Sequence, residues 1–459
     1  MKFLFIYPTT DEFSLEEGEK KYMFVPPLGI LYLSAVLEEN GHRVKVLDLR
    51  GEEFAKDKLK NFLNDIDAIG ITIANFSFKN SIKICRLIRE IDNDIPIIIG
   101  GPLCSLYPKK TLLETGADIC IKGEGENLMY FIEKILNENF DFEGVYYKKG
   151  GGIKGNGTAD YVKRLDSLPF PSIDLVEKYE YGYLFNYKFF KQKFTGILTS
   201  RGCPHNCLFC SKIEGMEKYR ERSPENVVKE IEFLYHRGYK AISFIDDNFL
   251  VNKKRVEKIM DLILDRDMEI NFMVQGARID SADPEIFKKM KKAGVNVIAF
   301  GIESGNQDVL NFYRKNITIE KIQYAVKLSK KFGFFTIGNF IIGAPIENER
   351  HIIKTIKFAK SLPLDFALFF PLDYSAGSEL WKRAVKDKKI HEDEYLVRSD
   401  SRRGIGKFTA DDLEKWQIKA YKQFYFNPIY LFRKFFDILK RRDFRIIKGG
   451  LNLAKIIFE

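Results

Sequence analysis

The sequence predicts an α/β protein built from a doubly wound parallel sheet, then a partial (β/α)6 barrel, then a helical tail. This prediction rests on two long stretches in which short apolar strands alternate with helical patterns. It also rests on a final stretch that is helical throughout. The chain of 459 residues also exceeds one ordinary domain. The expected parts are a first domain at 1–140, a hairpin-containing linker at 141–190, a barrel at 191–395 and a helical, basic and amphipathic region at 396–459.

Five strand-like segments predict the first domain. They are the apolar or alternating stretches KFLFIYP, HRVKVLDL, AIGITIAN, IPIIIGG and DICIKGEGE. Helical patterns separate them: LGILYLSAVLEENG ends on Gly41 as a C-cap, and others fall near 53–63, 79–91, 108–115 and 125–138. Strands and helices that alternate in this way indicate a Rossmann-like sheet.

The carboxyl ends of these strands form the edge at which such a sheet binds ligands. Small and polar residues gather there, namely Ala74, Asn75, Gly100, Gly101, Gly123 and Glu124. Glycines at that edge would let a bulky flat ligand approach the backbone, and the alternative is that all six are ordinary turn residues. No complete GxGxxG follows the first strand, so the pattern does not favour a nicotinamide cofactor.

A connector precedes the second alternating series. GVYYKKGGGIKGNG predicts a hairpin, and the two prolines of LDSLPFPSIDL favour an extended path. Six strand-like segments start near residue 193: FTGILTS, AISFIDDN, INFMVQGAR, VNVIAFGIES, FTIGNFIIG and DFALFFPL. Helical stretches between them indicate a partial TIM-like barrel whose working residues lie at the strand carboxyl ends. In the final region, Asn427 and Pro428 are suited to begin a helix.

Half of the six cysteines stand together in TSRGCPHNCLFCSK, directly after the first barrel strand. Cys203, Cys207 and Cys210 are spaced i, i+4 and i+7, and the sparse cysteines elsewhere argue against a disulfide scaffold. A [4Fe-4S] cluster normally takes four cysteines, so three would leave one iron open to an exchangeable ligand. The alternatives are coincidence and a Cys3His zinc site that uses His205, which the tight loop disfavours.

CxxxCxxC with an aromatic residue before the last cysteine, Phe209 here, resembles the radical S-adenosylmethionine (SAM) superfamily. The resemblance implies a [4Fe-4S] cluster whose open iron is chelated by the amino and carboxylate groups of SAM. It also implies that an electron, supplied by a donor such as ferredoxin or flavodoxin, cleaves SAM to methionine and a deoxyadenosyl radical that abstracts a hydrogen atom.

By the same resemblance, polar residues at the other strand ends are candidates for SAM contacts, and no catalytic residue is assigned. The candidates are Asp247, Arg278, Glu303, Ser304 and Asn339, with Gly343 in the last segment. Asp246, Asp247 and Asn248 are expected to point into the cavity. The alternative for each polar side chain is a helix cap or an internal salt bridge.

The order of a doubly wound domain, a hairpin linker, SLPFP and this barrel resembles the cobalamin-binding radical SAM enzymes, which include hopanoid methylases and the anaerobic bacteriochlorophyll ring cyclase. PPLGILYLSAVLEENGHRVKVLD and IGGP…GEGE carry the resemblance in the first domain. Older cobalamin enzymes have Asp-x-His-x-x-Gly, whose His ligates cobalt, but Arg50 stands at that place in DLRGEEF and His42 precedes its strand. The resemblance therefore implies cobalamin without a histidine ligand, with loss of cobalamin binding as the alternative.

Three further cysteines, Cys85, Cys104 and Cys120, raise the alternative of a methylthiotransferase, since those relatives bind a second cluster through three N-terminal cysteines. Cys85 falls in a helical pattern and Cys120 in a strand, so buried small apolar residues are the better interpretation. The tail also lacks the β-rich pattern of the RNA-binding domain of methylthiotransferases. The expected reaction is instead methyl transfer to an unactivated carbon. The alternatives are cyclisation or rearrangement without methyl transfer, and a non-catalytic iron-sulfur or zinc protein.

The net charge of +10 is concentrated near the C-terminus, where residues 419–459 hold ten Lys or Arg and three acidic residues. A uniform nucleic-acid-binding surface is therefore not expected. The mixture of apolar and basic residues in this stretch is typical of interfacial helices, and it favours a lipid-like or tetrapyrrole substrate at a membrane surface. The alternative is that Phe432, Phe435 and Phe436 pack against the barrel. No signal peptide or long apolar segment is found, so the expected location is the cytoplasm.

Overall fold

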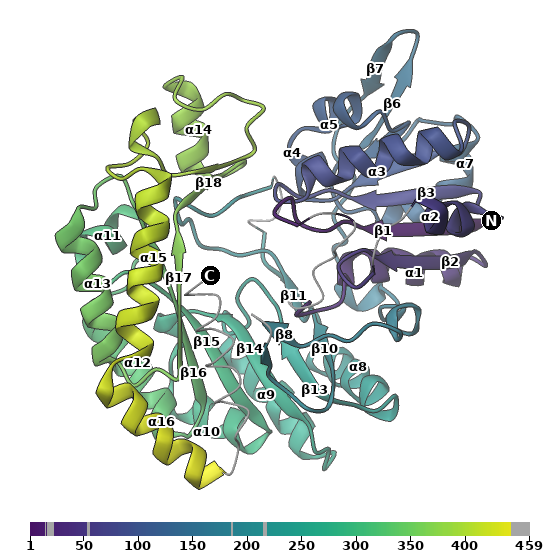
Figure 1. The fold of residues 1–459 in the computed structure, drawn as a ribbon. Helices are drawn as coiled ribbons and strands as arrows, with labels where there is room; N and C mark the ends of the chain where they lie inside the picture. Colours follow the sequence, from purple (N-terminus) through teal and green to yellow (C-terminus); the bar gives the residue numbers. More distant parts are fainter. Residues whose placement is uncertain (14, 16–22, 53–55, 185–186, 214–217, 442–459) are drawn as a thin grey trace. The chain divides into compact units, whose positions relative to one another are not determined.

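The computed structural model describes residues 1–13, 15, 23–52, 56–184, 187–213 and 218–441. The chain divides into two compact units, the first built mainly from Met1–Leu184 and the second beginning at Phe185 (Figure 1). Each unit has its own parallel sheet and its own buried apolar core.

The first unit contains a seven-stranded sheet in the order β2-β1-β3-β4-β5-β6-β7. The first five strands are parallel, as predicted: β1 Lys2–Tyr7, β2 Arg43–Asp48, β3 Ala68–Thr72, β4 Ile97–Gly100 and β5 Ile119–Ile121. The order 2-1-3-4-5 is that of a doubly wound sheet whose direction of winding reverses between β1 and β3. Ligands bind such sheets outside the carboxyl ends of the strands at that reversal.

The predicted hairpin is present and continues this sheet. β6 (Val145–Lys149) pairs antiparallel with both β5 and β7 (Gly152–Gly155). The connector that follows holds two short 3-10 helices, η2 (Leu165–Ser167) and η3 (Ile173–Val176). The short strands β8 and β9 comprise Tyr183–Leu184 and Tyr187–Lys188.

The helices of the first unit match the predictions except after β4 and β5. The helices that match are α1 Leu28–Glu39, α2 Lys56–Leu63, α3 Phe78–Ile91 and α5 Pro108–Thr115. An additional helix, α4 (Pro102–Leu106), begins at Pro102. The single helix expected at 125–138 is instead two short ones, α6 (Glu126–Met129) and α7 (Ile132–Leu136), because Phe131 leaves the helical region at φ −115° and ψ 13°.

The second unit contains six parallel strands in the order β10-β13-β14-β15-β16-β17, which confirms the partial barrel (Figure 1). They are β10 Lys193–Ile197, β13 Tyr239–Phe244, β14 Asn271–Ala277, β15 Val295–Glu303, β16 Phe335–Ile342 and β17 Phe366–Pro371. Fully buried phenylalanines from five of these strands fill the core: Phe244, Phe272, Phe300, Phe340 and Phe369. Rings of neighbouring strands stack, as in Phe340 and Phe369 with centroids 5.1 Å apart, so the core also holds the strands in register.

Helices cover the outside of this sheet. They are α8 Pro224–His236, α9 Lys253–Leu264, α10 Pro284–Lys292, α11 Gln307–Phe312, α12 Ile319–Lys331 and α13 Glu349–Ser361. Five of them begin at capping side chains that the sequence places one residue ahead: Ser223, Asn252, Asp283, Thr318 and Asn348. A short 3-10 helix, η4 (Ile279–Ser281), follows β14.

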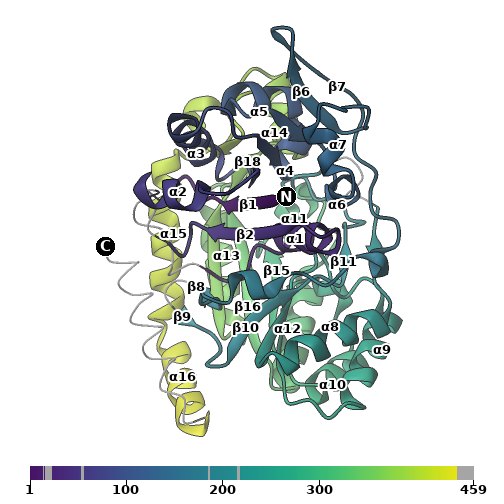
Figure 2. The ribbon, with the colours of Figure 1, turned by 90° about the vertical axis from the view of Figure 1, so that its right-hand side faces the viewer.

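The C-terminal part combines two long helices with short strands. α15 (Ala410–Tyr425) and α16 (Pro428–Arg441) run one after the other along the outside of the barrel, whereas residues 442–459 of the predicted tail lie outside the described residues (Figure 2). The remaining elements are β11 Ser200–Arg201, β12 Arg220–Glu221, β18 Asp373–Ser375, α14 Glu379–Lys386, β19 Leu396–Arg398 and η5 Ser401–Arg403. Within the described part of the chain, no helix has the length and apolar character needed to span a membrane.

Candidate active site

The cysteine loop follows β10 and β11 and is fastened to distant parts of the second unit. The amide of buried Leu208 donates to the carbonyl of Tyr313 at 3.1 Å, and the carbonyl of Leu208 accepts from the amide of Leu380 at 3.2 Å. The amide of Lys212 donates to the carbonyl of Gly377 at 3.3 Å, and the Ser211 hydroxyl to that of Ala376 at 2.5 Å. These bonds fix the loop at the carboxyl-end side of the strands.

The three predicted ligand cysteines are neighbours within this loop. Cys203 and Cys207 are half-buried and Cys210 is exposed. Desolvation of its sulfur, together with the thiols of Cys207 and Cys203, raises the pKa of Cys210 to about 11. Three thiols in one short loop after a strand are the donor set that a [4Fe-4S] cluster with one open iron requires. Because ligands must be deprotonated, cluster binding would release these protons.

No three His, Cys, Asp or Glu side chains of the described residues converge on a point where one metal ion could sit. A four-iron cluster does not need such a point, because each cysteine binds a different iron. His205, the fourth ligand of the zinc alternative, instead has Nε2 3.4 Å from Nδ2 of Asn248. Burial lowers the pKa of His205.

An aromatic and a cationic side chain from another part of the second unit lie against Phe209 of the loop. Phe209, the aromatic residue of the motif, makes a T-shaped contact with Tyr313 at 5.1 Å between centroids. The ammonium group of Lys315 lies 6.0 Å from the centroid of the Phe209 ring. Residues between α11 and α12 therefore contact the cysteine loop.

Arg278, Glu303 and Lys315 form a buried charged cluster beside the loop. Nε and Nη2 of Arg278 each lie 3.0 Å from a carboxylate oxygen of Asp280, and Nη2 also donates to the carbonyl of Lys315 at 2.7 Å. Nζ of Lys315 donates to Oε1 of Glu303 at 2.6 Å. The internal salt bridges considered as alternatives for Arg278 and Glu303 are thus present.

The backbone near Glu303 is arranged around this ion pair. Glu303 has φ +66°, a left-handed conformation that non-glycine residues seldom adopt and that is found preferentially at functional sites. At Gly301, a Cβ atom would lie 2.6 Å from Oε1 of Glu303 and 2.9 Å from Nζ of Lys315. Sequence reasoning missed Lys315, because it lies between two helices and not at a strand end.

Asp246 and Asp247, the acidic residues that follow β13, have different hydrogen-bond partners. Oδ1 of Asp246 accepts from the amide and hydroxyl of Thr199, at 3.0 and 2.9 Å, and from the Ser200 hydroxyl at 2.5 Å. The expectation that Asp246 points into a cavity is wrong, since it binds the turn that leads into the cysteine loop. Asp247 accepts from the amide of Gly202, next to the first cysteine, and burial raises the pKa of Asp247.

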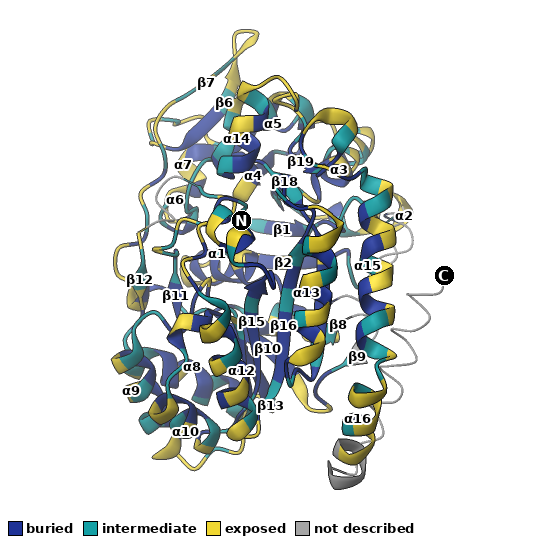
Figure 3. Ribbon diagram, turned by 90° about the vertical axis from the view of Figure 1, so that its left-hand side faces the viewer, coloured by how far each residue is buried: buried dark blue, intermediate teal, exposed yellow. Residues whose placement is uncertain are grey.

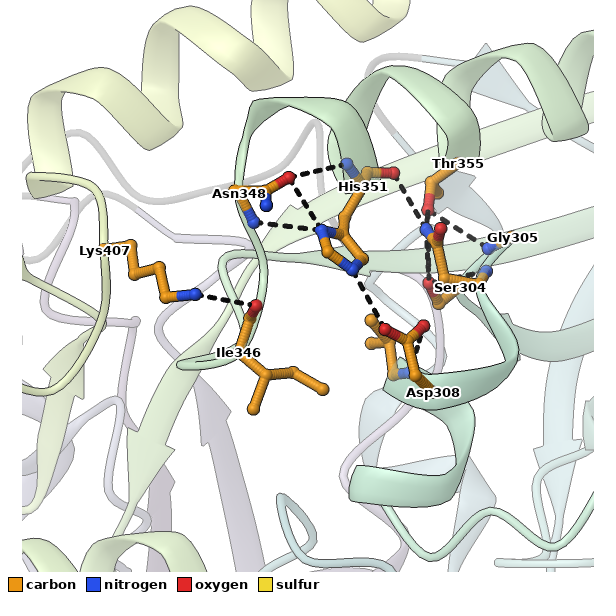
Figure 4. A network of polar contacts seen from close by, with 10 residues as sticks. Ser304, Gly305, Asp308, Ile346, Asn348, His351, Thr355 and Lys407 are labelled. Carbon is orange, nitrogen blue, oxygen red and sulfur yellow. Dashed lines mark hydrogen bonds and ion pairs between the residues drawn. The ribbon is translucent and has the colours of Figure 1, made fainter.

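The turn after β15 is held by the start of α13 (Figure 4). The hydroxyls of Ser304 and Thr355 lie 3.1 Å apart, and Thr355 Oγ1 accepts from the amide of Gly305 at 3.1 Å. His351 binds Asp308 through Nε2 at 2.9 Å and Asn348 through Nδ1 at 2.8 Å. The buried Ser304 hydroxyl thus already has an internal partner.

The turn after β16 contains a carboxyl group that the sequence did not single out. Asn339 lies within β16, half-buried, and Gly343 follows the strand. Oε2 of Glu347 accepts from the amides of Gly343 and Ala344 at 2.7 and 2.8 Å, while its other oxygen is buried without a hydrogen-bond partner. Burial raises the pKa of Glu347 to about 7. Its position in GNFIIGAPIE, four residues after Gly343, is the only signal that could have indicated it.

In the first unit, the predicted glycines at the strand ends have different roles. Gly101 has φ +100°, and a Cβ there would lie 2.7 Å from Thr72 Oγ1. Gly123 has φ +104°, and a Cβ there would lie 2.9 Å from the carbonyl oxygen of Ala159. Only at Gly100 is the nearest atom 3.9 Å away, which is ordinary contact. Gly101 and Gly123 are therefore required by the turns themselves, whereas Gly100 leaves the backbone accessible.

The other three residues of this edge lie beside these glycines. Ala74 and Asn75 follow β3, at the reversal between β1 and β3. Oε2 of Glu124 accepts from the amide of Val162 at 2.8 Å. All six candidates therefore lie at one edge of the sheet, as the strand ends predicted.

Arg50, at the place of the missing histidine, lies half-buried at the carboxyl end of β2. Its guanidinium binds both carboxylate oxygens of Asp48 and lies 4.3 Å from the centroid of the Tyr7 ring. The hydroxyl of Tyr181 donates to the same carboxylate at 3.0 Å. His42 lies at the opposite end of β2, 3.3 Å from the terminal amino group. This set of donors fits a cobalamin that receives no histidine ligand from the protein.

The three scattered cysteines of the first unit are buried, as expected. Cys120 contacts the Thr111 hydroxyl at 3.8 Å, and burial raises the pKa of Cys85 to about 12. Protonated thiols in an apolar core behave as small hydrophobic groups.

Comparisons with known proteins agree with both units. The radical SAM superfamily model matches residues 197–359, and the B12 binding domain model matches residues 19–131. The chain is 31% identical to the uncharacterized methyltransferase PH0819 of Pyrococcus horikoshii, over 100% of this chain and 99% of the relative. It is 24% identical to the anaerobic magnesium-protoporphyrin IX monomethyl ester cyclase of Rubrivivax gelatinosus, over 82% of this chain and 69% of the relative.

A solved structure has the same fold. The cobalamin-dependent S-adenosylmethionine radical enzyme OxsB, with aqua-cobalamin and S-adenosylmethionine bound, aligns with a TM-score of 0.73 at 17% identity, over 99% of this chain and 75% of that one. The protein therefore belongs to the family of radical SAM enzymes that carry an N-terminal B12 binding domain.

Proposed function

We propose that this protein is a cobalamin-dependent radical SAM methyltransferase that methylates an unactivated carbon of a lipid-like or tetrapyrrole substrate. The observation that carries the proposal is the cysteine loop, which holds Cys203, Cys207 and Cys210 in one short segment at the carboxyl-end side of a six-stranded barrel, in a chain with a B12 binding domain. The cluster, SAM and cobalamin together supply radical hydrogen abstraction and methyl transfer.

Cys203, Cys207 and Cys210 would hold three irons of the cluster and leave the fourth for SAM. Residues of the neighbouring strand ends, Asp247, Arg278, Glu303, Ser304 and Asn339, would contact SAM. The proposal is supported by the position of Lys315, whose ammonium group links Glu303 to Phe209 of the motif. Because Glu303 and Lys315 already neutralise each other, they can meet a zwitterionic ligand without an unpaired buried charge.

In the first unit, the six strand-end residues Ala74, Asn75, Gly100, Gly101, Gly123 and Glu124 would surround cobalamin. Gly100 would lie against the ligand, while Gly101 and Gly123 shape the turns on either side. Arg50 cannot ligate a metal while both its Nε and Nη2 donate to Asp48, so the protein would bind cobalamin without a histidine or arginine ligand.

A second candidate is a cyclisation or rearrangement without methyl transfer. The similarity to a cyclase named for magnesium-protoporphyrin IX monomethyl ester favours it, whereas the relative that covers the whole chain is named a methyltransferase. Both candidates need a small-molecule substrate and an electron donor of the ferredoxin or flavodoxin type. A peripheral contact with a membrane surface, where a lipid-like substrate would be found, is part of the proposal.

Anaerobic reconstitution tests the cofactors. We expect about four irons and four sulfides per chain, and a change in the absorbance of hydroxocobalamin on binding. Cys203→Ala, Cys207→Ala and Cys210→Ala should each abolish the iron signal and SAM cleavage, whereas Cys85→Ala should retain both. Stoichiometric zinc without iron in the native protein would contradict the radical assignment.

The products then separate the two candidates. Methyl transfer with two molecules of SAM yields S-adenosylhomocysteine together with 5′-deoxyadenosine, whereas cyclisation yields 5′-deoxyadenosine alone. Release of both nucleosides in equal amounts with a tetrapyrrole or isoprenoid substrate would support methylation. Deoxyadenosine without S-adenosylhomocysteine during substrate turnover would favour the second candidate.

A further inference from the structure

The last described helix presents an apolar face to solvent. Ile429, Leu431, Phe432, Phe435 and Phe436 are all at least half exposed, and Ile429 and Phe432 reach 75% and 68% (Figure 3). Their i, i+3 and i+4 spacings place them on one side of α16, and the rings of Phe432 and Phe436 lie 4.7 Å apart. These five residues are called the apolar face of α16. A contiguous apolar patch of this kind, exposed on a protein surface, indicates an interaction site.

The opposite side of α16 fixes this orientation through polar bonds. The Tyr430 hydroxyl donates to the carbonyl of Asp365 at 3.0 Å, and Arg433 donates to the carbonyl of Leu364. The buried ammonium of Lys434 pairs with the carboxylate of Asp365. The alternative in which the phenylalanines pack on the barrel and the bases face solvent is therefore wrong for Phe432, Phe435, Phe436, Arg433 and Lys434. Turning the phenylalanines inward would break a buried ion pair, which is strongly unfavourable.

Exposed lysines lie on α15, the helix that precedes the apolar face in the chain. Lys415, Lys419 and Lys422 are exposed on α15 and share one side of that helix by their i, i+4 and i+7 spacing. The sequence from 419 to 459 holds ten Lys or Arg and three acidic residues. Two copies of this chain that paired through α16 would bring these cationic segments together, and like charges repel. An anionic surface would instead attract them.

We propose that the apolar face of α16 is the site at which this protein docks on a bilayer that contains anionic lipids. The phenylalanine rings enter the boundary between headgroups and acyl chains, and the lysines of α15 lie at the lipid phosphates. This inference rests on the membrane contact in the proposed function and names the surface that makes it. Vesicle binding needs no turnover, so its outcome is separate from the assignment of the reaction.

Co-sedimentation with vesicles tests the surface in the full chain with its cluster reconstituted. Vesicles of phosphatidylcholine with phosphatidylglycerol are compared with phosphatidylcholine alone. We expect binding to the anionic vesicles that weakens with salt, and a loss of at least about tenfold in partition for Phe432→Ser/Phe436→Ser. The matched control, Leu264→Ser/Tyr324→Ser, removes two exposed apolar side chains of the same unit, 41% and 53% exposed, and should bind like the native protein. Equal iron content and SAM cleavage in all three proteins would show that the site itself is intact.

Three outcomes would overturn the proposal. The first is equal partition of the native protein and the phenylalanine variant. The second is a native dimer that the variant converts to a monomer, which would assign the face to a second copy. The third is binding that appears only after removal of residues 442–459, which would assign the face to that segment.

Discussion

Arg50 and Asp48 form a buried bidentate ion pair, with Nε 2.9 Å from Oδ1 and Nη2 2.7 Å from Oδ2, at the position where older cobalamin enzymes place their ligating histidine. Asp48 is fully buried and receives a further hydrogen bond from Tyr181. The pair holds the pKa of the Arg50 guanidinium above its usual value even though burial by itself lowers it. An ordered ion pair therefore occupies the end of β2.

Breaking this pair should destabilise the first unit. Arg50→Met leaves a buried carboxylate without its cation, and we expect a loss of roughly 3–5 kcal/mol in the free energy of unfolding, measured by urea denaturation. Arg50→Met/Asp48→Leu removes both charges and should recover most of that loss. Recovery would fail if Arg50 acted mainly through its contact with the Tyr7 ring.

Glu303 and Lys315 should contribute both to the stability of the fold and to SAM cleavage. A double-mutant cycle can measure the two contributions separately. Glu303→Gln and Lys315→Met each leave one buried charge unpaired and should each cost about 3 kcal/mol of unfolding free energy. The double variant should regain stability within about 1 kcal/mol of the native protein. SAM cleavage should stay at least about 100-fold below native in the double variant, because the charged pair that would position the cosubstrate is missing. Native rates in the double variant would make the pair purely structural.

Glu347 should make stability depend on pH. Burial raises its pKa from an ordinary 4.5 to about 7, so the folded protein holds a proton that the unfolded chain releases. The contribution of Glu347 to stability is therefore complete below about pH 4.5 and is lost as the pH rises through 7, by on the order of 3 kcal/mol. Glu347→Gln should lose this fall between pH 5 and 7.5, as followed by thermal unfolding, while the other groups titrate unchanged. An identical slope in the variant would refute the assignment.

Two adjacent glycines at the end of β4 should respond differently to alanine. Gly101 has φ +100° and ψ −171°, a region that is almost restricted to glycine, and Gly101→Ala should cost about 1–3 kcal/mol of unfolding free energy. Gly100→Ala meets no close atom and should leave the unfolding free energy within about 1 kcal/mol of native. Titration with hydroxocobalamin should show weaker binding in Gly100→Ala. Native affinity there would place cobalamin away from Gly100.

The order of strands and helices, the two sheets and the cysteine cluster could be predicted from the amino-acid sequence, because each depends on a local pattern or spacing. The alternation that predicts β3 or β15 is visible in a few neighbouring residues, and the cysteine spacing needs no partner elsewhere. The contacts between side chains that lie far apart in the sequence could not be predicted in this way. Lys315 joins the candidate site through Glu303, twelve positions away, and Asp246 turns to Thr199, 47 positions away.

The orientation of α16 illustrates the physical reason. Its amphipathic pattern could be satisfied either by packing phenylalanines on the barrel or by exposing them, and the pattern is the same in both cases. The buried carboxylate of Asp365, which also pairs with Lys330, selects between them, since it binds the ammonium of Lys434 and so favours the arrangement with the rings outward. Long-range electrostatic pairing of this kind is absent from any local window of the sequence and arises only when the chain folds.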